Sequence, residues 1–115
     1  MPDQTADRDT DHTNLLHRMI GGSADARTEV LARAASSTAP SLLVAAAMLA
    51  RDADVLVRAG RYAATVRDRQ LVALAHARLR DDDDLFDALV RDHLAEHPDH
   101  LLAAWLAGPE HRSTS

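Results

Sequence analysis

The chain has 115 residues, of which 46% are hydrophobic and 3% aromatic, and its formal net charge is −5. This length suits a single domain, and the apolar content excludes a chain that is disordered throughout. The absence of cysteine excludes disulfide bonds, thiolate metal ligands and cysteine nucleophiles.

Alanine is the commonest residue, with 23 copies, whereas runs of β-branched residues are almost absent. Alanine has the highest helix propensity, and its small side chain lets neighbouring helices approach closely. Strands have little support, because β-branched and aromatic residues are the ones that favour them. The composition therefore predicts an all-α fold.

The sequence predicts a cytoplasmic protein that does not bind a membrane. Its N-terminus has no basic segment followed by an apolar one, so a signal peptide is not expected. The most apolar window, residues 41–50, is about half the ~20 residues that a membrane-spanning helix needs. All 13 basic residues are arginine, which together with the alanine content is typical of a GC-rich bacterial genome.

The first third of the chain predicts an acidic tail followed by two short helices. Residues 1–12 carry four aspartates and no apolar period, which is typical of a flexible, solvated tail. Thr13 or Asn14 is expected to cap a first helix that runs to Ile20, before a Gly-Gly pair that breaks it. Ser23 is a suitable N-cap for a second helix that runs to about Ala35.

The middle of the chain predicts a buried helix followed by an amphipathic one. Residues 41–50 are apolar nearly all round, so this third helix should lie at the centre of the domain. Asp52 or Asp54 caps a fourth helix, which contains Gly60 at a cost of roughly 1 kcal/mol relative to alanine. In the alternative interpretation the chain turns at Gly60, which makes two long helices on either side of it.

Two further helices flank the acidic run 81–84. The fifth, at about 68–80, begins with a capping aspartate at its first residue. The sixth, at about 85–97, is capped by Asp83 or Asp84. The acidic run lacks the spaced ligands, turn glycine and closing glutamate of a calcium loop, so we expect a solvated turn.

A last helix follows Pro98, which ends the sixth helix because the residue before a proline is pushed out of the α region. Asp99 is expected to cap it, and its apolar residues should face inward. We predict that Leu89, Leu102 and Trp105 pack together. The whole chain is then one domain of about seven helices at 13–108, between the acidic tail and a second flexible tail at 109–115.

The segment 67–108 resembles the repeat units of bacterial tetratricopeptide-repeat-like (TPR-like) helical proteins. An arginine-rich helix start leads through an acidic turn to a second helix that ends in a His-Pro pair. The matching residues are Arg67, Arg69, Leu74, Ala75, Leu79, Asp81, Asp82, Leu94, His97, Pro98, Leu102 and Ala103. The turn lacks the usual glycine, and Phe86 stands where the repeat usually has a small residue.

The resemblance implies stacked antiparallel helical hairpins with a groove that binds other proteins. It implies no catalytic residue and no cofactor, because the typical positions of the repeat are packing positions. The chain is therefore interpreted as a short member that acts as a protein-interaction or scaffold module. A protein partner is expected, and an open array this short also favours homo-oligomer formation through its apolar ends.

A first alternative is a metal-binding protein or enzyme that uses His93 and His97. With Glu96 they spell the HxxEH zinc motif of inverted zincin peptidases, in which both histidines share a helix face. His100 extends the motif to a surface histidine cluster. Because Pro98 ends the helix at once, we favour a structural role in which the histidines complement the negative end of the helix dipole.

A second alternative is a binder of acidic ligands or nucleic acid. Residues 58–80 include six arginines and one aspartate, whereas residues 81–99 include eight acidic residues and one arginine. The candidate binding residues are Arg58, Arg61, Arg67, Arg69 and Arg78. Because few aromatic residues accompany them, nucleic acid is the weaker choice. The two blocks are otherwise expected to pair between stacked hairpins or between molecules.

Overall fold

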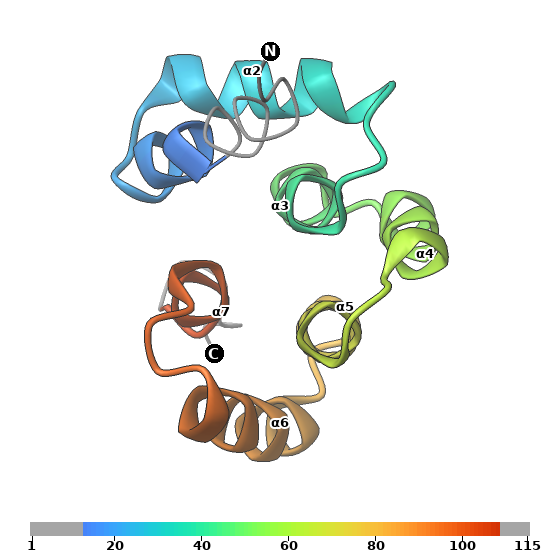
Figure 1. Ribbon diagram of the computed structural model, residues 1–115, viewed down its shortest axis with the longest axis vertical. Coiled ribbons are helices and arrows are strands. Elements are labelled where there is room, and N and C mark those ends of the chain that lie inside the picture. The colour runs from blue at the N-terminus through green and yellow to red at the C-terminus, as the bar shows by residue number, and fades with distance from the viewer. Residues whose placement is uncertain (1–12, 109–115) are drawn as a thin grey trace, which may run out of the picture.

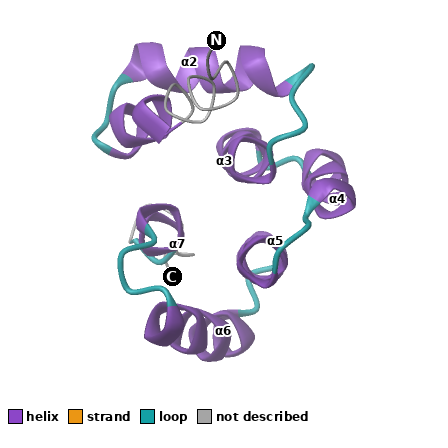
Figure 2. Ribbon diagram, viewed as in Figure 1, coloured by secondary structure: helices purple, strands orange, loops and turns teal. Residues whose placement is uncertain are grey.

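The computed structural model describes residues 13–108, which form seven helices and contain no strand (Figures 1 and 2). This confirms the all-α prediction; the predicted tails at 1–12 and 109–115 lie outside the described residues. After a first helix at 13–20, the helices are α2 (Ala24–Ala34), α3 (Pro40–Ala50), α4 (Ala53–Tyr62), α5 (Val66–Leu79), α6 (Asp83–Glu96) and α7 (Leu101–Leu106).

The helices are stacked as successive hairpins. Helix α3 contacts α2, α4 and α5, and α5 in turn contacts α4, α6 and α7. Helices α3, α5 and α7 therefore form an inner row, and α2, α4 and α6 lie outside it (Figure 1). No helix of the described residues is long and apolar enough to cross a bilayer.

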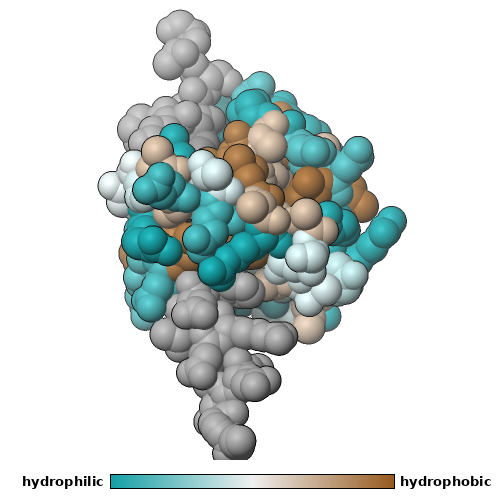
Figure 3. Space-filling view, turned by 90° about the horizontal axis from the view of Figure 1, so that it is seen from above, coloured by the Kyte–Doolittle hydropathy of each residue, from teal (hydrophilic) through white to brown (hydrophobic). Residues whose placement is uncertain are grey.

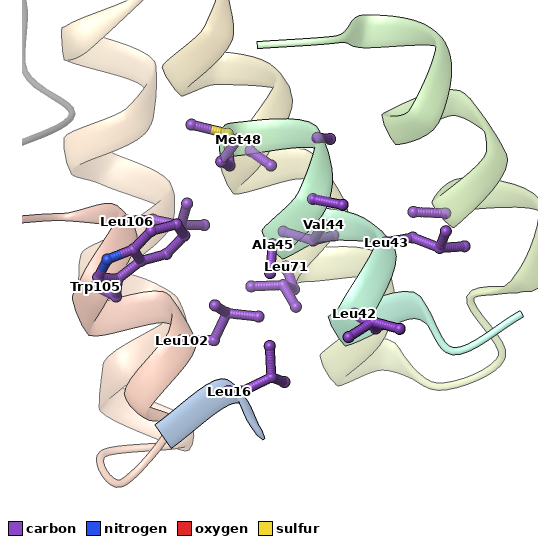
Figure 4. Packing of buried hydrophobic residues seen from close by; sticks show 14 of the residues in the cluster. Leu16, Leu42, Leu43, Val44, Ala45, Met48, Leu71, Leu102, Trp105 and Leu106 are labelled. Carbon is purple, nitrogen blue, oxygen red and sulfur yellow. The ribbon is translucent and has the colours of Figure 1, made fainter. Parts of the chain in front are cut away.

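The core is centred on α3, as its apolar sequence predicts. Residues 42–48 are all buried, and the alanines among them leave room for α5 to approach. Leu16 of the first helix, Leu71 of α5 and Leu102 of α7 point toward one another (Figure 4). The first helix thus packs against the inner row, and the core is shared between elements far apart in the sequence.

The predicted burial of Leu102 and Trp105 is confirmed, whereas their contact with Leu89 stays a prediction. Trp105 is 9% exposed and belongs to the same buried cluster as Leu102, and Leu89 is partly buried against that cluster. The indole is therefore a core side chain, and most of its apolar area is removed from water.

The interpretation with Gly60 inside a helix is confirmed, and the alternative with two long helices is wrong. The chain reverses earlier, where Arg51 adopts a left-handed conformation with φ 51°. Asp52 then caps α4 by accepting a hydrogen bond from the backbone N–H of Asp54 at 2.9 Å. Ser23 caps α2 in the predicted way, with the N–H of Ala26 as donor.

The predicted cap of the fifth helix is wrong. Thr65, not Asp68, has the extended backbone of an N-cap, and its hydroxyl accepts a hydrogen bond from the N–H of Asp68 at 3.0 Å. Asp68 lies instead in the first turn of α5, where a carboxylate is stabilised by the positive end of the helix dipole.

The acidic run is solvent-exposed, as predicted, but α6 begins within it, at Asp83, earlier than predicted. Asp81 turns the chain with φ 56°, so Asp82 takes the N-cap position and accepts from the N–H of Leu85. The capping role predicted for Asp83 or Asp84 is therefore wrong; both lie in the first helical turn.

The predicted cap of the last helix is also wrong. His100, not Asp99, occupies the N-cap position of α7, and no side-chain hydrogen bond caps this helix. The reason is that the His100 side chain turns inward toward α6 and becomes buried.

Candidate functional site

Two of the five candidate arginines hold the ends of other helices. Arg58 on α4 donates to the backbone carbonyls of Ala34 and Ser37, at the C-terminus of α2. Arg78 on α5 is 1% exposed and donates from Nε to the carbonyl of Leu106, the last residue of α7, at 3.3 Å. A cation is favourable at the negative end of a helix, so both side chains stabilise the fold.

The environment of Arg78 shows why it could be buried. Its guanidinium carbon lies 3.6 Å from the centre of the Phe86 ring, and its Nη1 forms an ion pair with Asp83 at 3.1 Å. Part of the predicted pairing between the basic and acidic blocks therefore occurs inside one molecule. Arg78 does not belong to a solvent-facing basic surface.

The other three candidate arginines are exposed. Arg69 donates to the carbonyl of Ala64 at 3.3 Å. No hydrogen bond or ion pair joins Arg61 or Arg67 to another residue in the described part of the chain. The five arginines thus do not share one face, and binding of acidic ligands or nucleic acid stays a prediction that rests on the exposed three.

Two of the three clustered histidines are buried and His97 is partly exposed, so the prediction of a surface cluster is wrong for His93 and His100. His93 on α6 and His100 before α7 are 1% and 6% exposed. His93 Nδ1 lies 2.7 Å from Oε1 of Gln70 on α5, and His93 Nε2 lies 2.6 Å from His100 Nδ1. The turn at Pro98 brings His100 back onto the end of α6, which joins α5, α6 and α7 through one chain of hydrogen bonds.

The HxxEH motif does not form a metal site in this fold. Both ring nitrogens of His93 already have protein partners, and the His97 ring lies beside it with centroids 4.9 Å apart. Among residues 13–108 no group of three histidine or carboxylate side chains is arranged to hold a metal ion. A neutral imidazole binds a metal through a free nitrogen lone pair, which His93 does not have.

Burial keeps the paired histidines neutral. The pKa of His93 is lowered first by burial and then by the positive charges of His97 and Arg67. The pKa of His100 is lowered to about 4, again first by burial and then by the charge of Arg67. Both rings are therefore uncharged at neutral pH, and each carries one proton.

A pocket of about 570 Å³ lies beside this cluster, where the first helix meets the starts of α3, α5 and α7. We call it the entrance pocket. Its lining includes Leu16, Ile20, Pro40, Arg67, His100 and Leu101. A second, smaller hollow of about 280 Å³ shares Arg67, Asp99 and His100 with it. His100 is thus a buried side chain that borders both hollows.

Large apolar side chains are also exposed outside the entrance pocket. Leu31, Val57, Tyr62 and Leu85 are each more than two-fifths exposed, and they lie on α2, α4 and α6. On the face seen in Figure 3, apolar side chains gather along the middle and are bordered by hydrophilic ones. Among residues 13–108, Leu101 alone combines such exposure with a place in the entrance pocket.

Comparison of the chain with protein-family models, with curated proteins and with solved structures found no match in any of the three. The stacked helical hairpins agree with what the TPR-like resemblance implies about the fold. Membership of that superfamily stays a prediction, and the case for function rests on the geometry of the entrance pocket.

Proposed function

We propose that the protein is a protein-interaction module that binds a segment of a partner protein in the entrance pocket. The pocket supports this because its volume, about 570 Å³, lies in the range of ligand-binding pockets. The cytoplasmic location and the bacterial origin that the sequence predicts are part of the same proposal.

The chemistry of the pocket wall suits a peptide. Leu16, Ile20 and Leu101 offer apolar contacts, and the 47% exposure of Leu101 leaves apolar area that a partner can bury. Arg67 and His100 add hydrogen-bonding groups at one side of this wall. An apolar wall with a few polar groups is the usual composition of a recognition pocket.

A display experiment tests the proposal. A library of random peptides is selected on the immobilised protein, and the affinities of the recovered peptides are measured by calorimetry. We expect Leu101→Asp to weaken binding at least tenfold, because it places a charge on the apolar wall. Leu85→Asp is the matched control: this leucine is 41% exposed on α6, outside the entrance pocket, and its substitution should leave binding unchanged.

Two results contradict the proposal. One is the recovery of no peptide that binds the wild-type protein. The other is a set of peptides that bind Leu101→Asp as well as the wild type, which would place the interaction elsewhere on the surface.

A further inference from the structure

The hydrogen bonds of the histidine chain fix where its protons lie. The amide oxygen of Gln70 can only accept, so His93 Nδ1 must carry the proton and donate it. Since His93 is neutral, its Nε2 then has a lone pair and accepts from Nδ1–H of His100. His100 is neutral as well, so its Nε2 is left without a proton.

That last nitrogen is a hydrogen-bond acceptor at the entrance pocket. His100 is 6% exposed and borders both hollows, and no hydrogen bond from a described residue reaches its Nε2. A ligand that donates a hydrogen bond to this nitrogen can replace water there, which keeps the acceptor satisfied when the pocket is filled. Arg67 lines the same hollows and supplies N–H donors.

An acceptor and a donor on one rim match the main chain of an extended peptide. In a β conformation the N–H and C=O of one residue point to the same side of the strand, and the N–H and C=O of the next residue point to the opposite side. An anionic ligand fits less well, because the carboxylates of Asp68 and Asp99 line the entrance pocket together with Arg67. The balance favours a ligand that is neutral at this point.

We infer that the entrance pocket binds the main chain of one extended residue of the partner segment, with its N–H donating to His100 Nε2 and its C=O accepting from Arg67. Gln70 and His93 are positioning residues, because they hold His100 in the tautomer that accepts. The side chain of the bound or neighbouring residue reaches the apolar wall at Leu16 and Leu101. This inference rests on the proposed function, whose partner segment it describes.

Long-range ¹H–¹⁵N NMR of the histidine rings tests the tautomers without any ligand. Protonation of both His93 and His100 on Nδ1 is expected, and a proton on His100 Nε2 overturns the inference. Gln70→Ala removes the acceptor and should mix the tautomers, whereas Gln70→Glu keeps an acceptor and should preserve them. A merely structural role of Gln70 would leave the ring signals of a folded Gln70→Ala variant unchanged.

A pair of small probes tests the main-chain hydrogen bond. N-acetyl-leucine methylamide presents one apolar residue with its N–H, and O-acetyl-leucic acid methylamide is identical except that an ester oxygen replaces that N–H. NMR titration should show binding of the amide at the residues of the pocket, and binding of the ester should be about tenfold weaker. Gln70→Ala should remove most of this difference. Equal affinity of the two probes overturns the inference.

The two proposals can fail separately. Recovery of pocket-dependent peptides, together with equal binding of amide and ester, would leave the interaction module standing and remove the main-chain contact. Binding of the amide probe at His100, together with a display selection that recovers no peptide, would keep the subsite and remove the proposed protein partner.

Discussion

Replacement of Arg78 by methionine tests the claim that a buried cation ties α5 to the end of α7. Methionine keeps much of the aliphatic volume but removes the guanidinium. The hydrogen bond to the Leu106 carbonyl is charge-assisted, and its loss costs about 1.5–3 kcal/mol. The contact with the Phe86 ring adds about 1–2 kcal/mol, because the ring is fully buried.

The ion pair with Asp83 adds little, because the Asp83 side chain is 57% exposed and such pairs contribute about 0–1 kcal/mol. Because methionine carries no charge, the variant avoids the desolvation cost of the buried guanidinium, which offsets part of the lost stability. We therefore expect Arg78→Met to lower the free energy of unfolding by about 2–4 kcal/mol. Asp83→Asn should lower it by less than about 1 kcal/mol.

The assay is equilibrium unfolding in urea, followed by the helical circular dichroism signal and extrapolated to water. Small domains have a total stability of about 5–15 kcal/mol, so Arg78→Met should still fold. An Arg78→Met variant that is as stable as the wild type would refute the reasoning. It would mean that the favourable contacts of the guanidinium do not exceed the free energy lost when its charge is removed from water.

Three further predictions use the same assay. Trp105→Ala should lower the free energy of unfolding by about 3–5 kcal/mol, because it empties a core site; a loss below about 1 kcal/mol would show that the indole is not packed. Acidification should destabilise the protein, because the pKa of His100 is about 4 in the folded state and its ordinary value in the unfolded chain is 6.5, so the unfolded state binds more protons as the pH falls through this range. The expected loss is about 2 kcal/mol between pH 7.5 and 5, to which His93 adds in the same direction; stability that is constant over this range would contradict the buried neutral pair. Arg58→Ala should lower the free energy of unfolding by about 1–2 kcal/mol, because its hydrogen bonds to the carbonyls at the end of α2 are lost. Arg61→Ala, the exposed control on the same helix, should change it by no more than about 0.5 kcal/mol. Equal effects of the two substitutions would mean that the C-terminus of α2 does not depend on Arg58.

The helices could be predicted because their signals are local. Apolar spacing, the Ala-rich window at 41–50 and breaks at Gly-Gly and Pro-containing segments depend on residues a few positions apart. Caps were harder, because several aspartates or threonines near one boundary compete for the same role. At α5 the extended backbone selects Thr65, and at α6 the left-handed Asp81 moves the cap to Asp82.

The candidate site could not be predicted in the same way. Gln70 and His93 are 23 positions apart, and no periodicity or motif links them. The HxxEH pattern drew attention to His93 and His97, but the fold pairs His93 with His100, which only the turn at Pro98 makes possible. Likewise, charge counts grouped the arginines into one block, whereas packing buries Arg78 and leaves Arg67 exposed.

The most direct measurement is a set of intermolecular NOEs between a selected peptide and the methyl groups of the protein. Our account predicts NOEs from an apolar side chain of the peptide to the methyl groups of Leu16 and Leu101, which line the entrance pocket. NOEs confined to exposed residues outside it, such as Val57 on α4 or Leu85 on α6, would contradict the account.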